Sequence, residues 1–208
     1  GSHFPMTEEE IDKMYGVPYH LFRPHNWRKD VTRIGTIPGD YIKELSNGKL
    51  DYDWPVDVNK LVVDGGHDAI FSIGQVVPHE IIGMANYNKN IFVGVGGSEG
   101  INKSHFLSAV IGVENILGTA DNPVRRLFNY ASEHFTKDLP ILYILTVVGY
   151  KDDGSLAIKG LYVGDDEECF HKAAELSTKE NITLVDKPLD KVVVYMEPSE
   201  FKSTWVGN

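Results

Sequence analysis

The fold is decided by residues 139–164, which read LPILYILTVVGYKDDGSLAIKGLYVG. The first twelve residues are an apolar run typical of a buried strand, and the Asp-Asp-Gly at 152–154 is typical of a turn. The following SLAIKGLYVG, at 155–164, then has the length and composition of a hairpin partner. This stretch therefore predicts two antiparallel strands, the first of them inside the protein.

The segments on either side of this hairpin predict helices and further strands. Residues 123–135 are amphipathic, with Pro123 in a plausible first helical turn, and one face carries Val124, Leu127, Phe128 and Ala131. We also predict helices at 104–117 and 165–181, strands at 58–65 and 69–80, and an apolar run into glycines at 90–97. The pattern indicates an α/β protein in which helices pack on a mixed sheet.

The two ends of the chain have different patterns. Thr7 and Glu10 form a capping box before a short helix that Gly16 should end. Residues 17–57 are rich in aromatic residues and prolines, with an extended piece at 31–37 and a helical turn at 40–48. At the other end, KVVVYMEP at 191–198 predicts the first strand of a second α/β domain. We therefore expect a catalytic, cofactor-binding domain at 1–186 without its amino-terminal part, and the start of a truncated domain at 187–208.

Composition narrows the class of protein. The 208 residues are 42% hydrophobic, and 20 Lys and Arg against 30 Asp and Glu give a formal charge of -10. This acidity disfavours a general nucleic-acid surface. No apolar run approaches the length of a membrane span, and the single Cys169 cannot form an internal disulfide. We expect a cytoplasmic protein that binds neither nucleic acid nor a membrane.

Residues 76–106, VVPHEIIGMANYNKNIFVGVGGSEGINKSHF, hold the candidate functional residues. The glycines invite a phosphate-loop interpretation, but a dinucleotide fingerprint from Gly94 and Gly96 would need glycine where Glu99 stands. A P-loop also fails, because the lysine and serine at 103–104 follow an asparagine instead of a glycine. Taken by themselves, the glycines are explained by a tight turn without a ligand. Evidence for a functional site must therefore come from the histidines.

His79 follows Pro78, Lys89 lies ten residues later, and His105 lies sixteen residues after the lysine. This arrangement resembles the nickel-dependent lactate racemase family. Asp-Asn-Pro-Val at 121–124 and the Gly-Asp at 164–165 are similar to the same family. So is the opening GSHFPMTEEEI, which favours His3 as a native residue over a tag remnant. The chain resembles the middle of the family's protein.

The resemblance implies racemisation or epimerisation of a small 2-hydroxy acid by hydride transfer to a nickel pincer nucleotide. This cofactor is a Ni pyridinium-3,5-bisthiocarboxylic acid mononucleotide. Lys89 would carry it, His105 would bind the nickel, and His3 and His79 would be the acid/base pair. Lys202 would hold the substrate carboxylate. Cofactor-synthesis proteins would be partners, and we expect the cofactor to be absent from this fragment because the family's phosphate-binding segment precedes it.

The chemistry of these residues agrees with the resemblance. Two histidines suit a reaction that needs a base on each face of one carbon, because each can take or give a proton near neutral pH. An imidazole nitrogen is a good nickel ligand, and a lysine amine is a nucleophile. Asn-Tyr-Asn-Lys at 86–89 departs from the family's Ser-Gly-Gly-Arg-Lys. Two alternatives therefore stay open: a binding or structural module without activity, and a zinc site of His79, His105 and a carboxylate such as Glu80 or Glu99.

Overall fold

The computed structural model of the protein describes residues 6–187 and 189–193. Its helices are α1 (Glu8–Tyr15), α2 (Gly39–Leu45), α3 (Lys60–Asp64), α4 (Ser98–Ile111), α5 (Pro123–Ala131) and α6 (Glu167–Asn181). Its strands are β1 (Val31–Ile37), β2 (Trp54–Asn59), β3 (Ile70–Gln75), β4 (Pro78–His79), β5 (Gly83–Met84), β6 (Ile141–Tyr150) and β7 (Leu156–Gly164). Short 3-10 turns lie at Tyr19–Leu21 and Val113–Asn115, and π-helical turns at Asn90–Gly94 and Ser132–Thr136.

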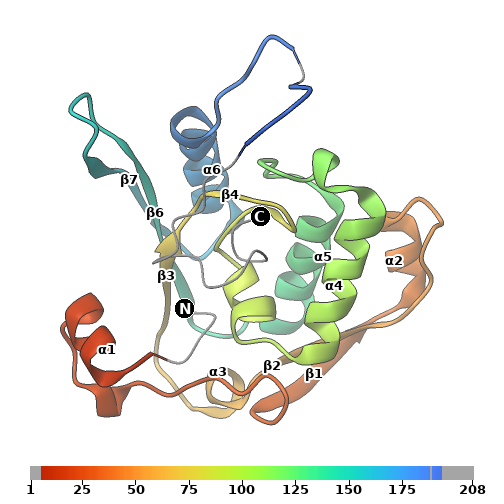
Figure 1. Ribbon diagram of the computed structural model, residues 1–208. Helices are drawn as coiled ribbons and strands as arrows, with labels where there is room; N and C mark the ends of the chain where they lie inside the picture. The colour runs from red at the N-terminus through yellow and green to blue at the C-terminus, as the bar shows by residue number, and fades with distance from the viewer. Residues whose placement is uncertain (1–5, 188, 194–208) are drawn as a thin grey trace.

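Strand β6 is the centre of a three-stranded sheet. It runs parallel to β3 and antiparallel to β7, so the sheet is mixed, as the sequence predicted. Its alternate residues Ile141, Tyr143, Leu145 and Val147 are buried, and helix α6 packs against β6 and β7 (Figure 1). The predicted hairpin and the helix that follows it are confirmed, because period-2 burial places one face of β6 against α6.

The far end of the hairpin extends away from the body of the protein (Figure 1). Tyr150, Leu156 and Ile158 are each 65–69% exposed there. The turn between the strands ends in Gly154, which has a positive φ of 79° and nothing near the position of a Cβ. The hairpin is therefore packed at its base and open at its tip.

A second layer holds the aromatic core. Helices α4 and α5 lie side by side, and the antiparallel ribbon of β1 and β2 lies along one end of them (Figure 1). The ring of Trp54 on β2 lies 6.1 Å from Phe92 and 5.8 Å from Phe128. The predicted apolar face of α5 is confirmed, since Val124, Leu127, Phe128 and Ala131 are all at most 1% exposed.

Two predicted elements have different bounds or type in the structure. The expected strand at 58–65 was wrong beyond Asn59, because the Asn59 side chain accepts a hydrogen bond from the Leu61 backbone N–H and starts helix α3. The helix expected to begin at Ser104 begins six residues earlier, at Ser98. The serine and glycines at 96–100 therefore belong to the start of α4 and to the turn before it.

The ends of the chain support part of the sequence interpretation. The capping box of Thr7 and Glu10 is present, and Gly16 ends α1 in the left-handed conformation. In the predicted strand at 191–198, residues 191–193 have no strand structure, and the remainder lies outside the described residues. The boundary at 186–187 stays a prediction. No helix in the described part of the chain combines the length and apolarity that a membrane span requires.

Candidate functional site

The structure brings His79, Lys89 and His105 into one half-buried neighbourhood. His79 lies on β4, Lys89 begins the π-helical turn at 90–94, and His105 lies in the middle of α4. The three are close enough to affect one another electrostatically: the positive charges of Lys89 and His105 both lower the pKa of His79, and Lys89 also lowers the pKa of His105. Three elements that are distant in sequence therefore bring these groups to one place.

His79 is held as a neutral imidazole. Burial lowers its pKa to about 4, and the charges of Lys89 and His105 add to this effect, while Glu80 opposes it. Its Nδ1 accepts a hydrogen bond from the Ile81 backbone N–H at 3.1 Å, and the Glu80 carboxylate lies 3.5 Å from the same atom. In the tautomer that accepts from Ile81, the ring proton is on Nε2. In the other tautomer the proton is on Nδ1 and faces Glu80, and Nε2 can accept a proton.

Lys89 is the second desolvated group of the site. Burial lowers the pKa of its amine, and the buried charge of Arg125 lowers it further, whereas the Glu80 carboxylate raises it. No ion pair to Lys89 occurs among the described residues. Desolvation of this kind makes the neutral, nucleophilic form of a lysine easier to reach than it is in water.

His105 is oriented by its own helix. Its Nδ1 donates to the Ile101 carbonyl at 2.7 Å, one helical turn earlier, which leaves the Nε2 lone pair available. Burial is the main cause that lowers its pKa, so the ring is neutral near pH 7. His105 is too far from the start of α4 to cap it, because the helix begins at Ser98. The ring instead has the tautomer that an Nε2 metal ligand needs.

The segment between His79 and Lys89 follows a tightly constrained path. Gly83 has a φ of 80°, and a Cβ there would lie 2.0 Å from the Thr119 carbonyl oxygen. Two consecutive non-glycine residues, Asn86 and Tyr87, also have positive φ, of 69° and 60°. Left-handed conformations are unfavourable for a side chain such as tyrosine, so the surrounding structure must hold this path in place.

Two side chains from the first turn of α5 supply much of that support. Asn122, the N-cap of α5, accepts from the Arg125 backbone N–H and donates to the Ile82 carbonyl. The Arg125 guanidinium, 1% exposed, donates to the Met84 and Asn86 carbonyls and to the Asn88 side chain. We did not predict these roles from the sequence. The available signal was a charged residue placed directly beside the apolar face of an amphipathic helix.

The glycine cluster has a structural explanation. A Cβ at Gly96 would lie 1.9 Å from the Phe92 carbonyl oxygen, and one at Gly97 would lie 2.6 Å from the Asp57 Cβ. A Cβ at Gly100 would meet the Pro55 carbonyl oxygen at 3.0 Å. Gly97 and Gly100 let α4 begin close against β2, Gly96 lets the chain pass close to the π-helical turn before it, and Gly94 has more space around it. Close packing of the chain on itself therefore accounts for most of the cluster.

The zinc alternative has no support in the described residues. Among residues 6–187 and 189–193, no three His, Cys, Asp or Glu side chains gather in a way that could hold a metal ion. Glu99 is engaged elsewhere, accepting from Arg33 and Lys103. His3 and Lys202 lie outside the described residues, so their roles stay predictions.

Solved structures resemble this chain over most of its length. A crystal structure of a protein from Thermotoga maritima matches 91% of this chain at 28% identity with a TM-score of 0.77. The lactate racemase apoprotein from Thermoanaerobacterium thermosaccharolyticum matches 84% of it at 21% identity with a TM-score of 0.60. The matches cover only 47% and 38% of those two chains, so this chain spans less than half of each.

Sequence comparisons give two results. A search of curated proteins gave no match. A family model described as the lactate racemase N-terminal domain matches residues 1–116, which is more than half of the 208 residues and includes His79, Lys89 and His105. The chain therefore belongs to the lactate racemase N-terminal domain family.

Proposed function

We propose that this chain forms part of a racemase or epimerase of a small 2-hydroxy acid that works with a nickel pincer nucleotide. The observation that supports this proposal most is the shared, half-buried neighbourhood of His79, Lys89 and His105. Family membership and the likeness to a lactate racemase apoprotein point to the same reaction class. We place the protein in the cytoplasm and expect cofactor-synthesis proteins as its partners.

His79 has the properties of a proton acceptor. Because its pKa lies near 4, the ring is neutral at pH 7 and can take the hydroxyl proton of a bound 2-hydroxy acid at Nε2. For this role the ring proton must move from Nε2 to Nδ1, where it would give up the hydrogen bond from the Ile81 N–H and face Glu80. The second base, which serves the opposite face of the same carbon, is assigned to His3, and the substrate carboxylate to Lys202.

The described residues fit the proposed cofactor in two respects. His105 presents Nε2 with its lone pair available, so it can serve as a single protein ligand to nickel. The Lys89 amine is desolvated, which suits covalent attachment through its nitrogen. A pincer nucleotide supplies the other nickel ligands itself, so no cluster of protein ligands is needed. When bound, the cofactor would supply a hydride acceptor for the substrate carbon.

Mass spectrometry of the intact protein tests the assignment of Lys89. The chain would be produced together with the cofactor-synthesis proteins and joined to the phosphate-binding segment that the resemblance places before it, as wild type and as the variants Lys89→Ala and Lys103→Ala. We expect a mononucleotide adduct on the wild type that Lys89→Ala abolishes. Lys103→Ala is a matched control, because Lys103 is bonded to Glu99 and to the Asp53 carbonyl; it should keep the adduct.

The same samples distinguish the alternatives. The nickel content of each sample, measured by elemental analysis, should be proportional to the amount of adduct. In His105→Ala the nickel content should fall, because the protein ligand to nickel is removed while Lys89 remains. An adduct of unchanged mass in Lys89→Ala would end the assignment of that lysine. A folded wild-type chain with no adduct and no nickel would favour a binding module without activity.

A further inference from the structure

Arg125 is a fully buried cation whose side-chain hydrogen bonds all go to one segment. Its Nη2 donates to the Met84 carbonyl, and its Nη1 donates to the Asn88 side chain and, at 3.4 Å, to the Asn86 carbonyl. These acceptors span the five residues that come directly before Lys89. A planar guanidinium can bind several acceptors in fixed directions, so it defines the path of this segment more closely than a point charge would.

The charge of Arg125 has no carboxylate partner among the described residues. Arg125 forms no ion pair within this part of the chain, and its buried Nε has no hydrogen-bond partner. The Cζ atom of its guanidinium lies 4.2 Å from the centre of the Phe170 ring. The next residue, Arg126, is exposed and forms a two-point ion pair with Asp121. Burying an unpaired charge is costly, so Arg125 is a poor choice for stability alone.

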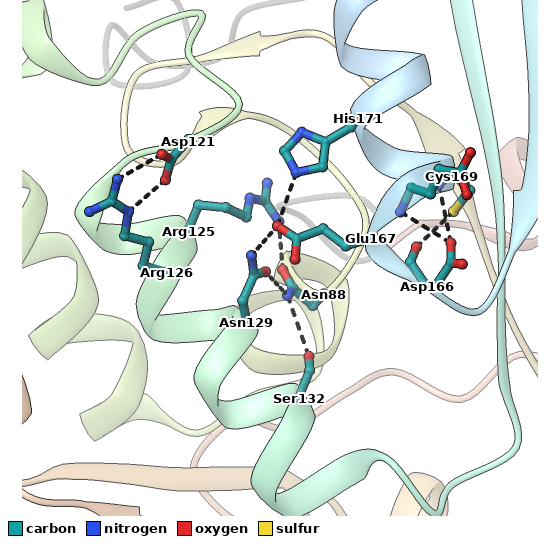
Figure 2. Close-up of polar contacts among 11 residues, drawn as sticks. Asn88, Asp121, Arg125, Arg126, Asn129, Ser132, Asp166, Glu167, Cys169 and His171 are labelled. Carbon is teal, nitrogen blue, oxygen red and sulfur yellow. Dashed lines mark hydrogen bonds and ion pairs between the residues drawn. The ribbon is translucent and has the colours of Figure 1, made fainter.

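A row of polar side chains fixes the segment from its other side. Figure 2 shows Asn88 between Arg125 and Asn129: it accepts from Arg125 and donates to Asn129 at 2.7 Å. Asn129 in turn donates to Glu167 at 2.6 Å, and His171 lies 3.0 Å from the same carboxylate. Asn88 is therefore held from both sides, one residue before Lys89.

The segment needs such support because of its backbone. Asn86 and Tyr87 are both left-handed, and the Tyr87 ring is held 4.4 Å from Tyr143 and 5.2 Å from Phe170. Without the hydrogen bonds of Arg125, the Met84 and Asn86 carbonyls would be buried and unsatisfied. Relaxation of the segment toward ordinary φ values would then move Lys89.

We propose that Arg125 is a positioning residue for Lys89: its guanidinium holds the segment 84–88 in its left-handed path and so fixes where the lysine side chain begins. The Lys89 amine is thereby kept in the neighbourhood of His79 and His105. Besides burial, two charges act on the pKa of the Lys89 amine: Glu80 raises it and Arg125 lowers it. The two histidines in the same neighbourhood have pKa values lowered by burial and by the charge of Lys89.

This inference rests on the proposed role of Lys89 for its biological meaning, but it can be tested without a cofactor. Wild type, Arg125→Met, Arg125→Lys and Arg126→Met would each be acetylated with N-hydroxysuccinimidyl acetate over a range of pH. Peptide mass spectrometry then compares Lys89 with Lys172, which is 61% exposed. Amide hydrogen exchange of residues 84–89 is measured on the same proteins.

The two Arg125 variants separate charge from hydrogen bonding. Arg125→Met should accelerate exchange at 84–89 by about tenfold or more and move the pH midpoint of Lys89 acetylation upward, because a neighbouring positive charge is lost. Arg125→Lys keeps the charge and loses the planar fork, so it should accelerate exchange and keep the midpoint close to that of the wild type. Arg126→Met should change neither quantity.

Wild-type exchange rates in both Arg125 variants, or an unchanged midpoint in a folded Arg125→Met, would overturn the proposal. If Arg125→Met does not fold, the test uses Arg125→Lys only: an exchange rate at residues 84–89 equal to that of the wild type would overturn the proposal. These outcomes are independent of the cofactor experiment, since absence of a nucleotide adduct would leave the acetylation midpoints as they are.

Discussion

The segment 83–89 and the β6–β7 hairpin contain the same backbone feature in opposite surroundings. Gly83 has a φ of 80° and Gly154 a φ of 79°. A Cβ at Gly83 would lie 2.0 Å from a backbone oxygen, whereas nothing lies within 4 Å of one at Gly154. At Gly154 no neighbouring atom constrains the left-handed backbone. At Gly83 the surrounding backbone and side chains leave no room for a side chain. Lys89, at the end of this constrained segment, is therefore held in a defined position.

Alanine at each of the two glycines is expected to have the largest effect and the clearest contrast. Gly83→Ala should lower the free energy of unfolding by about 3–4 kcal/mol, because it adds left-handed strain and a clash with the Thr119 carbonyl. Gly154→Ala should cost about 1 kcal/mol, from strain alone. Urea unfolding of both variants measures the difference. Equal losses would mean that the packing around Gly83 relaxes freely.

Stability should also depend on pH in segment 79–89 and not in the hairpin. The pKa of His79 is lowered from 6.5 in the unfolded chain to about 4 in the fold. Its contribution is therefore fully present above pH 6.5 and is lost as pH falls toward 4, by up to about 3 kcal/mol. His79→Asn keeps an acceptor for the Ile81 N–H and cannot be protonated.

The measurement is urea unfolding of the wild type and His79→Asn between pH 4.5 and 7.5. The wild type should lose more stability on acidification than the variant, and amide exchange in β6 and β7 should follow global unfolding only. Identical pH profiles of the two proteins would show that His79 is not desolvated in solution.

The hairpin was predicted well from the sequence, and segment 83–89 was not. Strand periodicity and the Asp-Asp-Gly turn are local signals, so residues 139–164 contain most of the information that forms them. The path of segment 83–89 depends on Asn122 and Arg125, which lie about forty residues away in sequence. The spacing of His79, Lys89 and His105 indicated the site, but no local pattern shows which side chains hold it.

Some residues adopt a backbone conformation that their own residue types do not favour, because a neighbouring side chain stabilises it. Residues 60–64, Lys-Leu-Val-Val-Asp, include two strand-forming valines, yet they form a helix whose first turn is capped by the Asn59 side chain. Tyr87 adopts a conformation that its own type disfavours because two aromatic rings hold it. Such exceptions concentrate around the candidate site, where strained backbone is expected.

The helix caps of the two regions give the smallest effect and the most closely matched pair. Asn122 caps α5 behind segment 83–89 and is 3% exposed, and Asp166 caps α6 after the hairpin, where it accepts from the Glu168 and Cys169 N–H groups. Asp166→Ala removes only a cap, which costs about 1 kcal/mol. Asn122→Ala also leaves the buried Ile82 carbonyl without its donor, so we expect a loss of about 2 kcal/mol.

The location of the loosening distinguishes these two variants better than the size of the loss. In Asn122→Ala, amide exchange should accelerate at residues 82–89 as well as in the first turn of α5, because the cap and the segment share one side chain. In Asp166→Ala it should accelerate only in the first turn of α6. If Asn122→Ala loosens α5 and leaves 82–89 protected, then Asn122 is not part of the support of Lys89, which then comes from Arg125, Asn129 and the rings that hold Tyr87.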